Sequence, residues 1–598
     1  MFGRTLFPPI GELPYFLTLA PHAFFWFSLE PQLIEAVAAE VHWADLPVLN
    51  VVGVWDNIVQ GSGKAVLESV FPNYIKERRW FGGKSRTILA VHIIESIAMP
   101  QNDLEGAYLV LLSVRFTEGD PQTYALPITF ATGERARSVR ENIPQTIIAQ
   151  LKLNGHDAPG VLYDALWDRD FSLLPLQAIA QHREFPGVEG KAIATTTSAF
   201  QPILGDKTAD DLDPSLARGE QSNTSVIYSD RFILKLFRRL EAGANPDLEI
   251  GRYLTDQRHF ACIPPVAGAI EYRKGNAEPI TLAILQGFVP NEGDAWKYTL
   301  DTLSGYFERI LSEYAEREAV KPPDKPLLEL IDEELPDLPR DMIDHYLEAA
   351  RLLGQRTAEM HLALSAEVTG VSFAPESFST MYQRSVYQTM RSQLGRVFQS
   401  LHKSLPKLPE AARPDAEKVH KLEPRILDCF QQMLALKIST ARIRCHGDYH
   451  LGQVLFTGND FMIIDFEGEP AKLLSERRRK RSPLTDVAGM LRSFHYAAYT
   501  AFFNEIESGI VLPEHIASTE RWARFWYTWV SATFLKSYLK TSASASFIPP
   551  TRDQIQAMLT AYLMDKAVYE LGYELNSRPS WARIPIWGIF NLLGEYAE

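Results

Sequence analysis

The chain has 598 residues, of which 46% are hydrophobic and 22% are charged, a composition typical of a globular protein with more than one domain. Its formal net charge of −14 argues against a nucleic acid as the main partner. The three cysteines are too far apart in sequence for a disulfide framework or a metal cluster and suit a reducing cytoplasm, and no apolar run reaches the roughly 18 residues of a membrane span.

The first 30 residues have the composition of β-strands. Short extended runs broken by Pro8, Pro9 and Pro14 lead to an aromatic stretch over 23–29. We interpret residues 1–30 as the end of a β-sheet domain; a strand arm that docks on the following domain is the alternative.

From residue 31 the pattern predicts an α+β module. Apolar residues recur at helical spacing over 33–41 and 66–75. The segments that follow are predicted as strands over 88–97, 107–116 and 122–130 and as helical pieces over 142–151 and 161–168. No group of catalytic residue types stands out, so composition leaves the role of this module open.

A strand near 191–200 leads to a polar loop between two extended runs. The loop contains Gly219, Gln221, Ser222, Asn223, Thr224 and Ser225. Backbone N–H groups in loops of small polar residues can approach phosphates, although the G-x-G-x-x-G pattern is absent here. We therefore consider this segment a candidate phosphate loop.

The strand that follows, residues 231–237, places Lys235 on one face with apolar neighbours. A lysine at this position of a kinase strand reaches the α- and β-phosphates of a nucleotide, whereas an ordinary edge-strand lysine is the alternative. Asn245-Pro246-Asp247 is typical of a helix start. Glu249 on that helix is a candidate partner for Lys235, although a glutamate in a first helical turn is also favoured by the helix dipole.

A Pro- and Gly-rich segment, residues 287–294, follows two further predicted strands. We interpret it as the hinge between two lobes, with Gln286, Phe288 and Val289 near an adenine. Beyond Asp294 the pattern is mostly helical. In the predicted helix 346–364, His361 is expected to be a packed or capping histidine rather than a ligand.

The segment 445–470 carries the strongest signal. Its turn residues separate two short apolar runs, Val454–Phe456 and Phe461–Ile464, which predict a β-hairpin. The hairpin places Asp448 before its first strand and Asp465 after its second, 17 residues apart. Both carboxylates can then face one cleft.

Phosphoryl transfer needs this arrangement, since one carboxylate accepts the proton of the attacking hydroxyl and a second, with a nearby amide, holds Mg²⁺. We assign Asp448 as the base, Asp465 as the metal carboxylate and Gln453 as the amide. In the protein-kinase signature the amide is an Asn at the same five-residue spacing from the base. The alternative is a turn that caps a hairpin, with carboxylates exposed by chance.

Three later features have two readings each. The five cations of Arg477–Arg481 form either a solvated loop or a basic segment beside the active site that offsets phosphate charge. Asp486 opens the next helix as a cap or as a support for the catalytic loop. Core packing is favoured over sugar stacking for the aromatic residues of the C-terminal part, among them Trp522, Trp526, Tyr527, Trp529, Trp581 and Trp587.

Together these motifs resemble the bacterial maltokinases, which belong to the aminoglycoside-phosphotransferase-like and protein-kinase-like superfamily. The resemblance covers the chain from about residue 31 to its end and rests on His446–Gln453, Ile464–Pro470, Arg478–Ser493, Arg79–Lys84, Gly219–Ser225 and Gln286–Asp294. It implies an α+β, bilobal protein-kinase-like fold with an N-terminal α+β cap at 31–195, a kinase N-lobe at 196–289 and a mostly helical C-lobe at 290–598.

The resemblance further implies ATP- and Mg²⁺-dependent phosphorylation of maltose at its anomeric hydroxyl, giving maltose 1-phosphate for α-glucan (glycogen) synthesis. Asp448 matches the family's catalytic base, and Gln453 and Asp465 match its metal ligands. Lys235 matches the phosphate lysine and Glu249, less surely, its partner. Glu467 fits the family's Asp-Phe-Glu, and whether it contacts the metal stays open.

Residues 1–30 resemble the last strands of the trehalose synthase that is fused ahead of maltokinase in some bacteria, so we expect trehalose synthase as a fused or associated partner. Two other functions remain. The first is the same chemistry on glucosamine, glucose or an aminoglycoside, because the motifs define the phosphate donor and not the acceptor. The second is a non-catalytic sugar-binding scaffold, which the presence of Asp448, Asp465 and Lys235 argues against.

Overall fold

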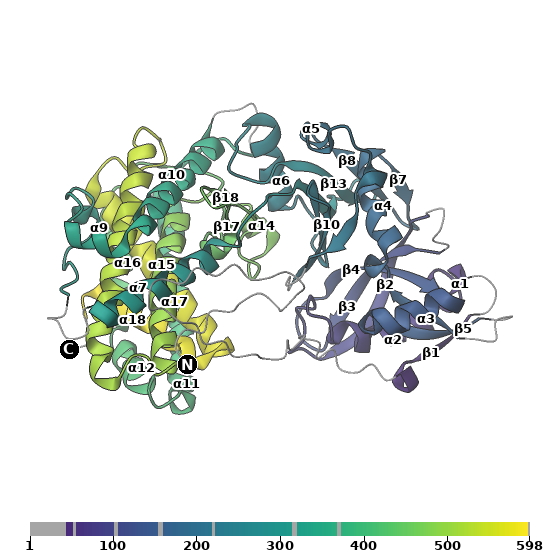
Figure 1. Ribbon diagram of the computed structural model, residues 1–598, viewed down its shortest axis with the longest axis horizontal. Helices are drawn as coiled ribbons and strands as arrows, with labels where there is room; N and C mark the ends of the chain where they lie inside the picture. The colour runs from purple at the N-terminus through teal and green to yellow at the C-terminus, as the bar shows by residue number, and fades with distance from the viewer. Residues whose placement is uncertain are drawn as a thin grey trace, which may run out of the picture. The chain divides into compact units, whose positions relative to one another are not determined.

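The computed structural model describes residues 43–51, 55–100, 106–153, 159–217, 222–313, 320–366 and 372–595. The chain divides into two compact units, Met1–Ser172 and Leu173–Glu598, with the boundary inside helix α4 (Arg169–Ala180) (Figure 1). The expected arm at 1–30 and the helix expected at 33–41 lie outside the described residues.

The first unit is built on a twisted sheet with the strand order β1-β5-β6-β4-β3-β2. Neighbouring strands are antiparallel except for the parallel pair of β1 and β5. The strands are β1 (Val48–Val51), β2 (Ile88–Ala98), β3 (Tyr108–Phe116), β4 (Gln122–Ala131), β5 (Ile147–Leu153) and β6 (Gly160–Asp164). The strands expected at 88–97, 107–116 and 122–130 are thereby confirmed.

Helices α1 (Asp56–Val59), α2 (Lys64–Lys76) and α3 (Gly133–Asn142) complete the first unit. Leu67 and Phe71 of α2 are fully buried in one apolar cluster with Val110 and Leu112 of β3. The helix expected at 66–75 is therefore confirmed as α2, and its apolar face covers the sheet.

The helical pieces expected at 142–151 and 161–168 are wrong, because these segments form strands β5 and β6. All five residues of β6 are buried, so the segment lacks the alternation of a half-exposed strand. A short apolar run is compatible with either a buried helix or a buried strand. Pairing with β4 and β5 decides in favour of the strand.

The second unit opens with a seven-stranded antiparallel sheet in the order β7-β8-β13-β14-β11-β10-β9. Its strands are β7 (Glu184–Pro186), β8 (Lys191–Thr196), β9 (Pro214–Leu216), β10 (Asn223–Tyr228), β11 (Phe232–Phe237), β13 (Val266–Arg273) and β14 (Ile280–Gly287). β7 and β8 belong to this sheet because β8 pairs with β13 from Lys191 to Thr196. The two compact units divide at residue 172, and the cap boundary at residue 195 stays a prediction.

Two short helices flank this sheet, α5 (Phe200–Leu204) and α6 (Pro246–Arg252). Asn245 caps α6 by accepting a hydrogen bond from the backbone N–H of Asp247, and Pro246 occupies the first turn. The predicted helix start at 245–247 is confirmed. A π-helical turn, Tyr253–Gln257, continues α6.

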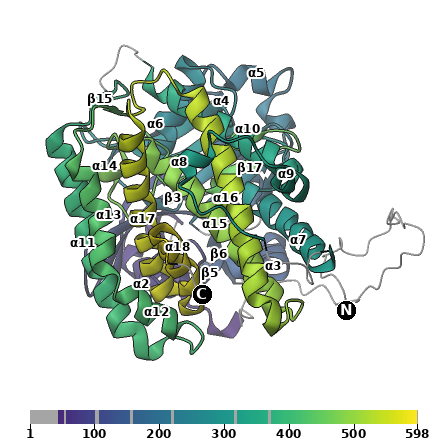
Figure 2. The same cartoon turned by 90° about the vertical axis from the view of Figure 1, so that its left-hand side faces the viewer.

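The rest of the second unit is helical, as expected. Its helices are α7 (Ala295–Glu313), α8 (Leu327–Leu330), α9 (Asp337–Ile343), α10 (His345–Ser365), α11 (Thr380–Ser404), α12 (Arg413–His420), α13 (Glu423–Ala435), α14 (Leu474–Arg477), α15 (Leu484–Glu507), α16 (Ile516–Thr541), α17 (Arg552–Ser577) and α18 (Arg583–Leu593). α10 lies along α16, and α15 packs against α16 and α17 (Figure 2). None of the described helices is long and apolar enough to cross a membrane.

The expected aromatic core lies between these helices. Trp522, Trp526 and Trp529 of α16 are almost fully buried, and Phe494 of α15 contacts the Trp526 ring edge-on. Trp581 and Trp587 are partly buried and pack against the same core. Core packing accounts for these rings.

Candidate active site

The catalytic loop lies between strand β16 (Ala441–Arg442) and the hairpin β17 (Val454–Phe456) and β18 (Phe461–Ile463) (Figure 1). The two hairpin strands pair in antiparallel register, as the sequence predicts. Gly447 has φ of +87°, a conformation that glycine adopts without strain. Asp465 adopts φ of +65°, which is uncommon for a residue with a side chain. Such geometry is typical of side chains that the fold must aim at a site.

Asp486, at the start of α15, holds the catalytic loop. Its carboxylate accepts hydrogen bonds from the backbone N–H groups of His446 and Gly447, at 2.8 and 3.0 Å. It is buried, and burial raises its pKa, but hydrogen bonds from His361 and from the backbone N–H of Gly447 hold that pKa below its usual value. From the sequence, Asp486 is expected to be either a helix cap or a support for the catalytic loop, and these contacts correspond to support of the loop.

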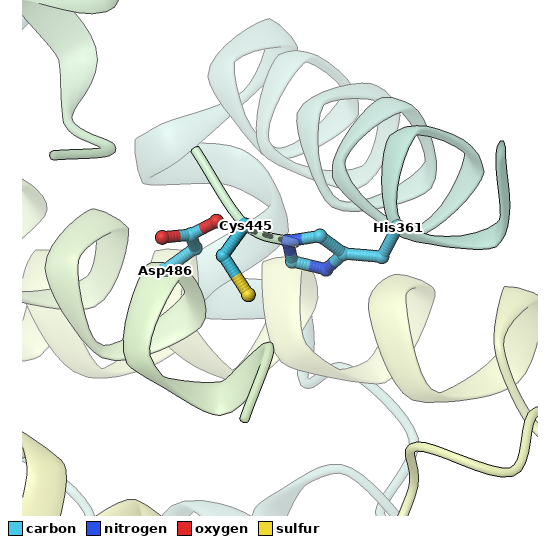
Figure 3. A group of neighbouring side chains, drawn as sticks. All are labelled: His361, Cys445 and Asp486. Carbon is cyan, nitrogen blue, oxygen red and sulfur yellow. Dashed lines mark hydrogen bonds and ion pairs between the residues drawn. The ribbon is translucent and has the colours of Figure 1, made fainter. Parts of the chain in front are cut away.

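His361 of α10 continues this network, and Figure 3 shows its ring directed at Asp486 with Cys445 beside them. Its Nε2 lies 3.1 Å from a carboxylate oxygen of Asp486, and its Nδ1 lies 3.0 Å from the hydroxyl of Tyr538. Nε2–H therefore donates to the carboxylate, and Nδ1 accepts from the tyrosine. The packed histidine expected at 361 fits this geometry.

Cys445 is the third member of the group in Figure 3. These three side chains offer ligand atoms within 4.8 Å of one another. Burial, above all, raises the pKa of the Cys445 thiol well above its usual value, and its Sγ lies 3.6 Å from the carbonyl oxygens of Ile443 and Arg481. A thiol that donates to carbonyl oxygens is a weak metal ligand, because metals bind the thiolate. The group supports the loop by hydrogen bonds.

Lys235 of β11 is surrounded by three carboxylates, and we call the four residues the carboxylate cluster: Lys235, Asp247, Asp465 and Glu467. The ammonium lies 2.6 Å from Asp465, 2.5 Å from Glu467 and 3.3 Å from Asp247. The alternation of residues along this strand places Lys235 on one face with apolar neighbours. The contacts of Lys235 agree with that placement. The cluster unites the predicted phosphate lysine with the predicted metal carboxylate.

Charge and burial act in opposite directions on these groups. Burial lowers the pKa of Lys235, but the three carboxylates raise it well above its usual value. Burial raises the pKa of Asp465, whereas the charge of Lys235 and hydrogen bonds from Lys235 and Gln453 lower it below its usual value. Burial and the neighbouring carboxylates raise the pKa of Glu467. One ammonium therefore neutralises only part of the negative charge.

Gln453 ends the short 3₁₀ turn Leu451–Gln453 and hydrogen-bonds the side chain of Asp465. The backbone N–H of Ile464 also donates to the carbonyl oxygen of Gln453, at 3.0 Å. The two predicted metal ligands are therefore neighbours.

The prediction that Glu249 fixes Lys235 is wrong in this structure. Glu249 forms ion pairs with Arg444, at 2.8 Å, and with Arg478, at 3.1 Å. Asp247 takes the position beside Lys235, and its second oxygen accepts the backbone N–H of Phe466, at 2.9 Å. Residues two apart on an α-helix point about 200° away from each other, so only one of them can face the lysine.

Of the candidate phosphate loop, Gly219 and Gln221 lie outside the described residues. Ser222 is exposed, and Asn223 begins β10. The amide of Asn223 donates to Glu467, at 3.1 Å, which connects the loop to the carboxylate cluster.

The next two loop residues are less exposed. Thr224 accepts a hydrogen bond from Nε of Arg238, at 2.9 Å. Ser225 is buried and lies opposite Lys235 in the antiparallel register of β10 and β11. The end of the loop is therefore held beside the strand that carries the lysine.

The hinge residues continue from β14. Gln286 is the partner of Ile233 in the β11 register, and the backbone N–H of Phe288 donates to the carbonyl oxygen of Arg231. The carbonyl oxygen of Val289 accepts from the side chain of Asn291, at 2.8 Å. Further along, Phe456 exchanges backbone hydrogen bonds with the segment 292–293. The hinge thus joins the sheet to the catalytic hairpin.

Asp448 lies in the loop beside a cation that the sequence did not reveal. Nζ of Lys566, on α17, is 3.4 Å from Oδ1 of Asp448, and Nε2 of His450 is 4.0 Å from Oδ2. Burial lowers the pKa of Lys566, but the charges of Asp448 and of two glutamates raise it above its usual value. Lys566 follows Asp448 by 118 residues in a helix whose local pattern indicates only packing.

The donor atoms of the cluster suit a divalent metal ion. Asp247, Asp465 and Glu467 offer carboxylate oxygens within 4.8 Å of one another. Carboxylate oxygens are the ligands that Mg²⁺ prefers, usually one or two of them together with substrate phosphates. The excess of carboxylates over the single ammonium leaves negative charge for such an ion.

Two protein-family models match this chain. The maltokinase N-terminal cap domain matches residues 74–168, and the phosphotransferase enzyme family matches residues 215–505. A glucosamine kinase of Streptacidiphilus jiangxiensis is 24% identical over 378 residues, 63% of this chain and 72% of that protein. A glucosamine kinase of Mycolicibacterium smegmatis is 24% identical over 392 residues, 63% of this chain and 81% of that protein.

Solved structures show the same fold. Glucosamine kinase in crystal form B has a TM-score of 0.57 at 18% identity, covering 91% of this chain and all of that one. Glucosamine kinase in complex with glucosamine, ADP and inorganic phosphate has a TM-score of 0.54 at 18% identity, covering 84% and 93% of the two chains. The expected α+β kinase-like fold with an N-terminal cap is confirmed.

Proposed function

Since this chain is a maltokinase-like protein of the kinase-like superfamily and a phosphotransferase enzyme, we propose that it transfers the γ-phosphoryl group of ATP to the anomeric hydroxyl of maltose. The observation that carries the proposal is the 2.6 Å contact between Lys235 and Asp465, with Gln453 bonded to the same carboxylate. It unites the phosphate lysine and the metal ligands in one site, with Asp448 on the catalytic loop before the hairpin. The match to a maltokinase cap domain supports maltose as the acceptor.

In this mechanism, Asp448 orients the sugar hydroxyl and accepts its proton as the bond to phosphorus forms. Lys566, at 3.4 Å, holds that carboxylate in place. Lys235, now bonded to three carboxylates, would contact the nucleotide phosphates. Asp465 and Gln453, with Glu467 beside them, would hold Mg²⁺, which supplies positive charge to the phosphate oxygens. Catalysis then consists mainly of positioning and charge neutralisation.

The nucleotide is proposed to lie at the sheet and hinge of the second unit. The loop Gly219–Ser225 would face the phosphates, while Gln286, Phe288 and Val289 would face the adenine. The hydrogen bond from Asn223 to Glu467 supports the first assignment. Glu249 has no direct part in this arrangement, because Arg444 and Arg478 hold it.

Glucosamine is the second candidate acceptor, and the similarity to two glucosamine kinases at 24% identity favours it. The phosphate-donor residues are the same for both acceptors, so they do not discriminate between them. Acceptor choice therefore has to be measured.

We propose trehalose synthase, fused or associated, as the source of maltose, and the cytoplasm as the place of reaction. The first proposal rests on the resemblance of residues 1–30 to the last strands of that enzyme. The second rests on the three free cysteines, Cys262, Cys429 and Cys445, none of which forms a disulfide.

The test is ADP release by the full chain with ATP and Mg²⁺ in the presence of maltose, glucosamine, glucose, trehalose or no sugar, with ³¹P NMR of the product. Maltose-dependent turnover that yields an anomeric phosphate is expected. Turnover with glucosamine alone would replace maltose by the second candidate. Absence of turnover with every sugar, in a chain that still binds ATP, would contradict the enzyme assignment.

Asp448→Asn is the matched control, since it removes the base and keeps the shape of the side chain. Loss of general-base catalysis typically lowers turnover by about 10²–10⁴-fold. We expect a fall in that range with ATP binding and circular dichroism unchanged. A variant that retains near-normal turnover would remove Asp448 from the mechanism.

A further inference from the structure

A second charged site lies in the helical part of the chain, and we call it the arginine pocket. It is a cavity of about 510 Å³ lined by Ser372, Glu376, Tyr382, Ser385, Arg442, Arg444, Arg478, Arg479 and Lys480. Five of these residues are cations and one is a carboxylate. Small-molecule sites commonly have volumes of about 300–1,000 Å³. The pocket therefore has the size of a ligand site and a strong positive charge.

The central observation is the incomplete hydrogen bonding of the buried Arg444 side chain. Its side chain is buried, with a residue exposure of 2%. Its Nη1 donates to Glu249, at 2.8 Å, but its Nη2 is buried and has no hydrogen-bond partner among the described residues. A buried donor without a partner costs about 1–3 kcal/mol, and more when it is charged. Such a donor at the wall of a cavity points to an acceptor that the chain does not supply.

Two of the other cations share one carboxylate, Glu376. Glu376 forms ion pairs with Lys480, at 2.9 Å, and with Arg442, at 2.6 Å. Nε of Arg442 is buried and has no hydrogen-bond partner among the described residues, although its guanidinium lies over the ring of Tyr382, at 4.3 Å. Within the described ranges, Arg479 has no ion pair.

Glu249 is the second carboxylate that compensates this charge. It accepts from Nε and Nη2 of Arg478, at 3.2 and 3.1 Å, in addition to Nη1 of Arg444. Four of the five cations pair with two carboxylates, Glu249 and Glu376, and Arg479 pairs with neither of them. The pocket keeps an excess of positive charge in a chain whose formal net charge is −14.

We propose that the arginine pocket binds a phosphorylated small molecule. Guanidinium groups match the oxygens of a phosphoryl group by paired N–H donors, which makes arginine the preferred residue for phosphate recognition. The unpartnered Nη2 of Arg444 and Nε of Arg442 supply donors for it, and Arg479 supplies a further charge. The hydroxyls of Tyr382, Ser372 and Ser385 are available to the remainder of the molecule.

This site differs from the nucleotide site of the proposed function. The nucleotide phosphates are assigned to Lys235 and Asp465, none of which lines the pocket. The connection between the two is α6, because Asp247 faces Lys235 while Glu249 faces Arg444 and Arg478. The pocket can therefore be tested by binding alone, whether or not the chain phosphorylates a sugar.

The experiment is isothermal titration of the full chain with pyrophosphate at constant ionic strength. The pocket variant is Arg442→Gln/Arg479→Gln, which removes two cations that do not contact Glu249. The charge-matched control is Arg340→Gln/Arg351→Gln, because both arginines are exposed on helices α9 and α10. Lys235→Met reports any pyrophosphate that binds at the nucleotide site.

We expect the pocket variant to lose at least tenfold in pyrophosphate affinity, while the control and Lys235→Met retain a site of the original affinity. Three results would overturn the proposal: no binding to the unsubstituted chain, equal losses in the pocket variant and its control, or binding lost in Lys235→Met and kept in the pocket variant. The first excludes a site, the second indicates general charge attraction, and the third assigns all binding to the nucleotide site.

Glu249→Gln is expected to raise pyrophosphate affinity, whereas the pocket variant is expected to lower it. Removal of this charge leaves Arg444 and Arg478 with a weaker acceptor and with more positive charge for the ligand. Pyrophosphate affinity is expected to rise severalfold, a gain that a damaged fold does not produce. A decrease in affinity would contradict the assignment of these two arginines. Inorganic phosphate and a hexose phosphate, titrated in the same way, then distinguish a site for the phosphoryl group alone from one that also recognises the attached molecule.

Discussion

Helix α6 carries one residue of each of two charge clusters, and the two clusters are unbalanced in opposite directions. In the carboxylate cluster, three carboxylates surround the single ammonium of Lys235. In the arginine pocket, four of the five cations pair with the carboxylates of Glu249 and Glu376. Each imbalance indicates the charge of what is missing: a cation in the first and an anion in the second.

The comparison also explains why each cluster tolerates its imbalance. Charges that face a cavity or a cleft keep part of their contact with water, so the cost of incomplete pairing is limited. The same charges in a closed core would require pairing, as Arg492 shows by donating from both Nε and Nη2 to one oxygen of Glu570. Incomplete pairing at two open places is therefore a sign of binding rather than of structure.

The largest effect is expected when the carboxylate cluster loses its metal carboxylate. Asp465→Asn keeps the side-chain volume but removes the charge beside Lys235. Electrostatic groups of this kind contribute about 10²–10³-fold to turnover, and we expect a loss near the upper end, with a higher Mg²⁺ concentration needed for half-maximal activity. Steady-state kinetics over a Mg²⁺ series measures both. An unchanged Mg²⁺ requirement would exclude Asp465 as a ligand.

Lys235→Met is expected to have the next largest effect, because it removes the only cation of the same cluster. Hydrogen bonds to charged groups contribute about 1.5–3 kcal/mol, which corresponds to a rise of about 10–100-fold in KM for ATP. Pyrophosphate binding in the arginine pocket should stay the same, which separates the two clusters. If KM for ATP rose and pyrophosphate affinity fell together, the two clusters would be one site.

Glu249→Gln tests the opposite side of α6. Arg444, at 3% side-chain exposure, loses the negative charge of its partner, and removing one member of a buried ion pair costs about 3–5 kcal/mol. Because Arg478 is one-third exposed, we expect the lower end, about 3 kcal/mol in the free energy of unfolding. Urea unfolding with and without pyrophosphate measures it, and pyrophosphate should restore part of the loss.

The control for this prediction is Glu348→Gln, which breaks an exposed ion pair with Arg351 on α10. Exposed pairs contribute about 0–1 kcal/mol. Equal losses in the two variants would mean that Glu249 holds no buried charge.

Local sequence patterns predict much of this arrangement. They do not predict contacts between residues that lie far apart in the sequence. The hairpin around Asp448 and Asp465 and the strand of Lys235 depend on residues close in sequence, and short-range patterns predict them. Assigning Glu249 to the lysine failed because a helix start does not reveal which of its acidic residues turns inward. Arg444 and Glu249 are 195 residues apart in the sequence, so no local pattern predicts their ion pair.

The first unit gives a similar lesson for the fold. The segments of β5 and β6 are short and apolar, and such segments become strands when neighbouring strands have backbone groups to pair with. Lys566 is the corresponding case in the active site. Only the folding of α17 against the catalytic loop places it beside Asp448.

The smallest effect is expected at Asp565, a carboxyl group that lies next to Lys566 in sequence and has no ion pair among the described residues. Burial raises its pKa to about 6, whereas the contact with Lys235 lowers the pKa of Asp465. Asp565 is therefore the counterpart of Asp465: the same residue type without a cation in contact. Its oxygen accepts only a hydrogen bond from Gln393, at 2.9 Å.

The sign of its contribution follows from the pKa. A carboxyl group whose pKa is higher in the folded state than its unfolded value, about 4, binds more protons when folded, so stability falls as the pH rises from about 4 to 6. A shift of about two pKa units corresponds to nearly 3 kcal/mol, and partial exposure of the side chain reduces this to about 2 kcal/mol. Asp565→Asn should therefore raise the free energy of unfolding by about 2 kcal/mol at pH 8 and by little near pH 4.

Urea unfolding of both proteins between pH 4 and 8 measures this difference, and Asn keeps the oxygen that accepts from Gln393. Asp337→Asn, at an aspartate of α9 with 92% side-chain exposure, is the control and should change stability by less than about 0.5 kcal/mol throughout. A stabilisation at Asp565 that is the same at pH 4 and pH 8 would have a cause other than ionisation. Only a gain that grows through pH 6 supports the contrast between a carboxylate held by Lys235 and one left without a cation.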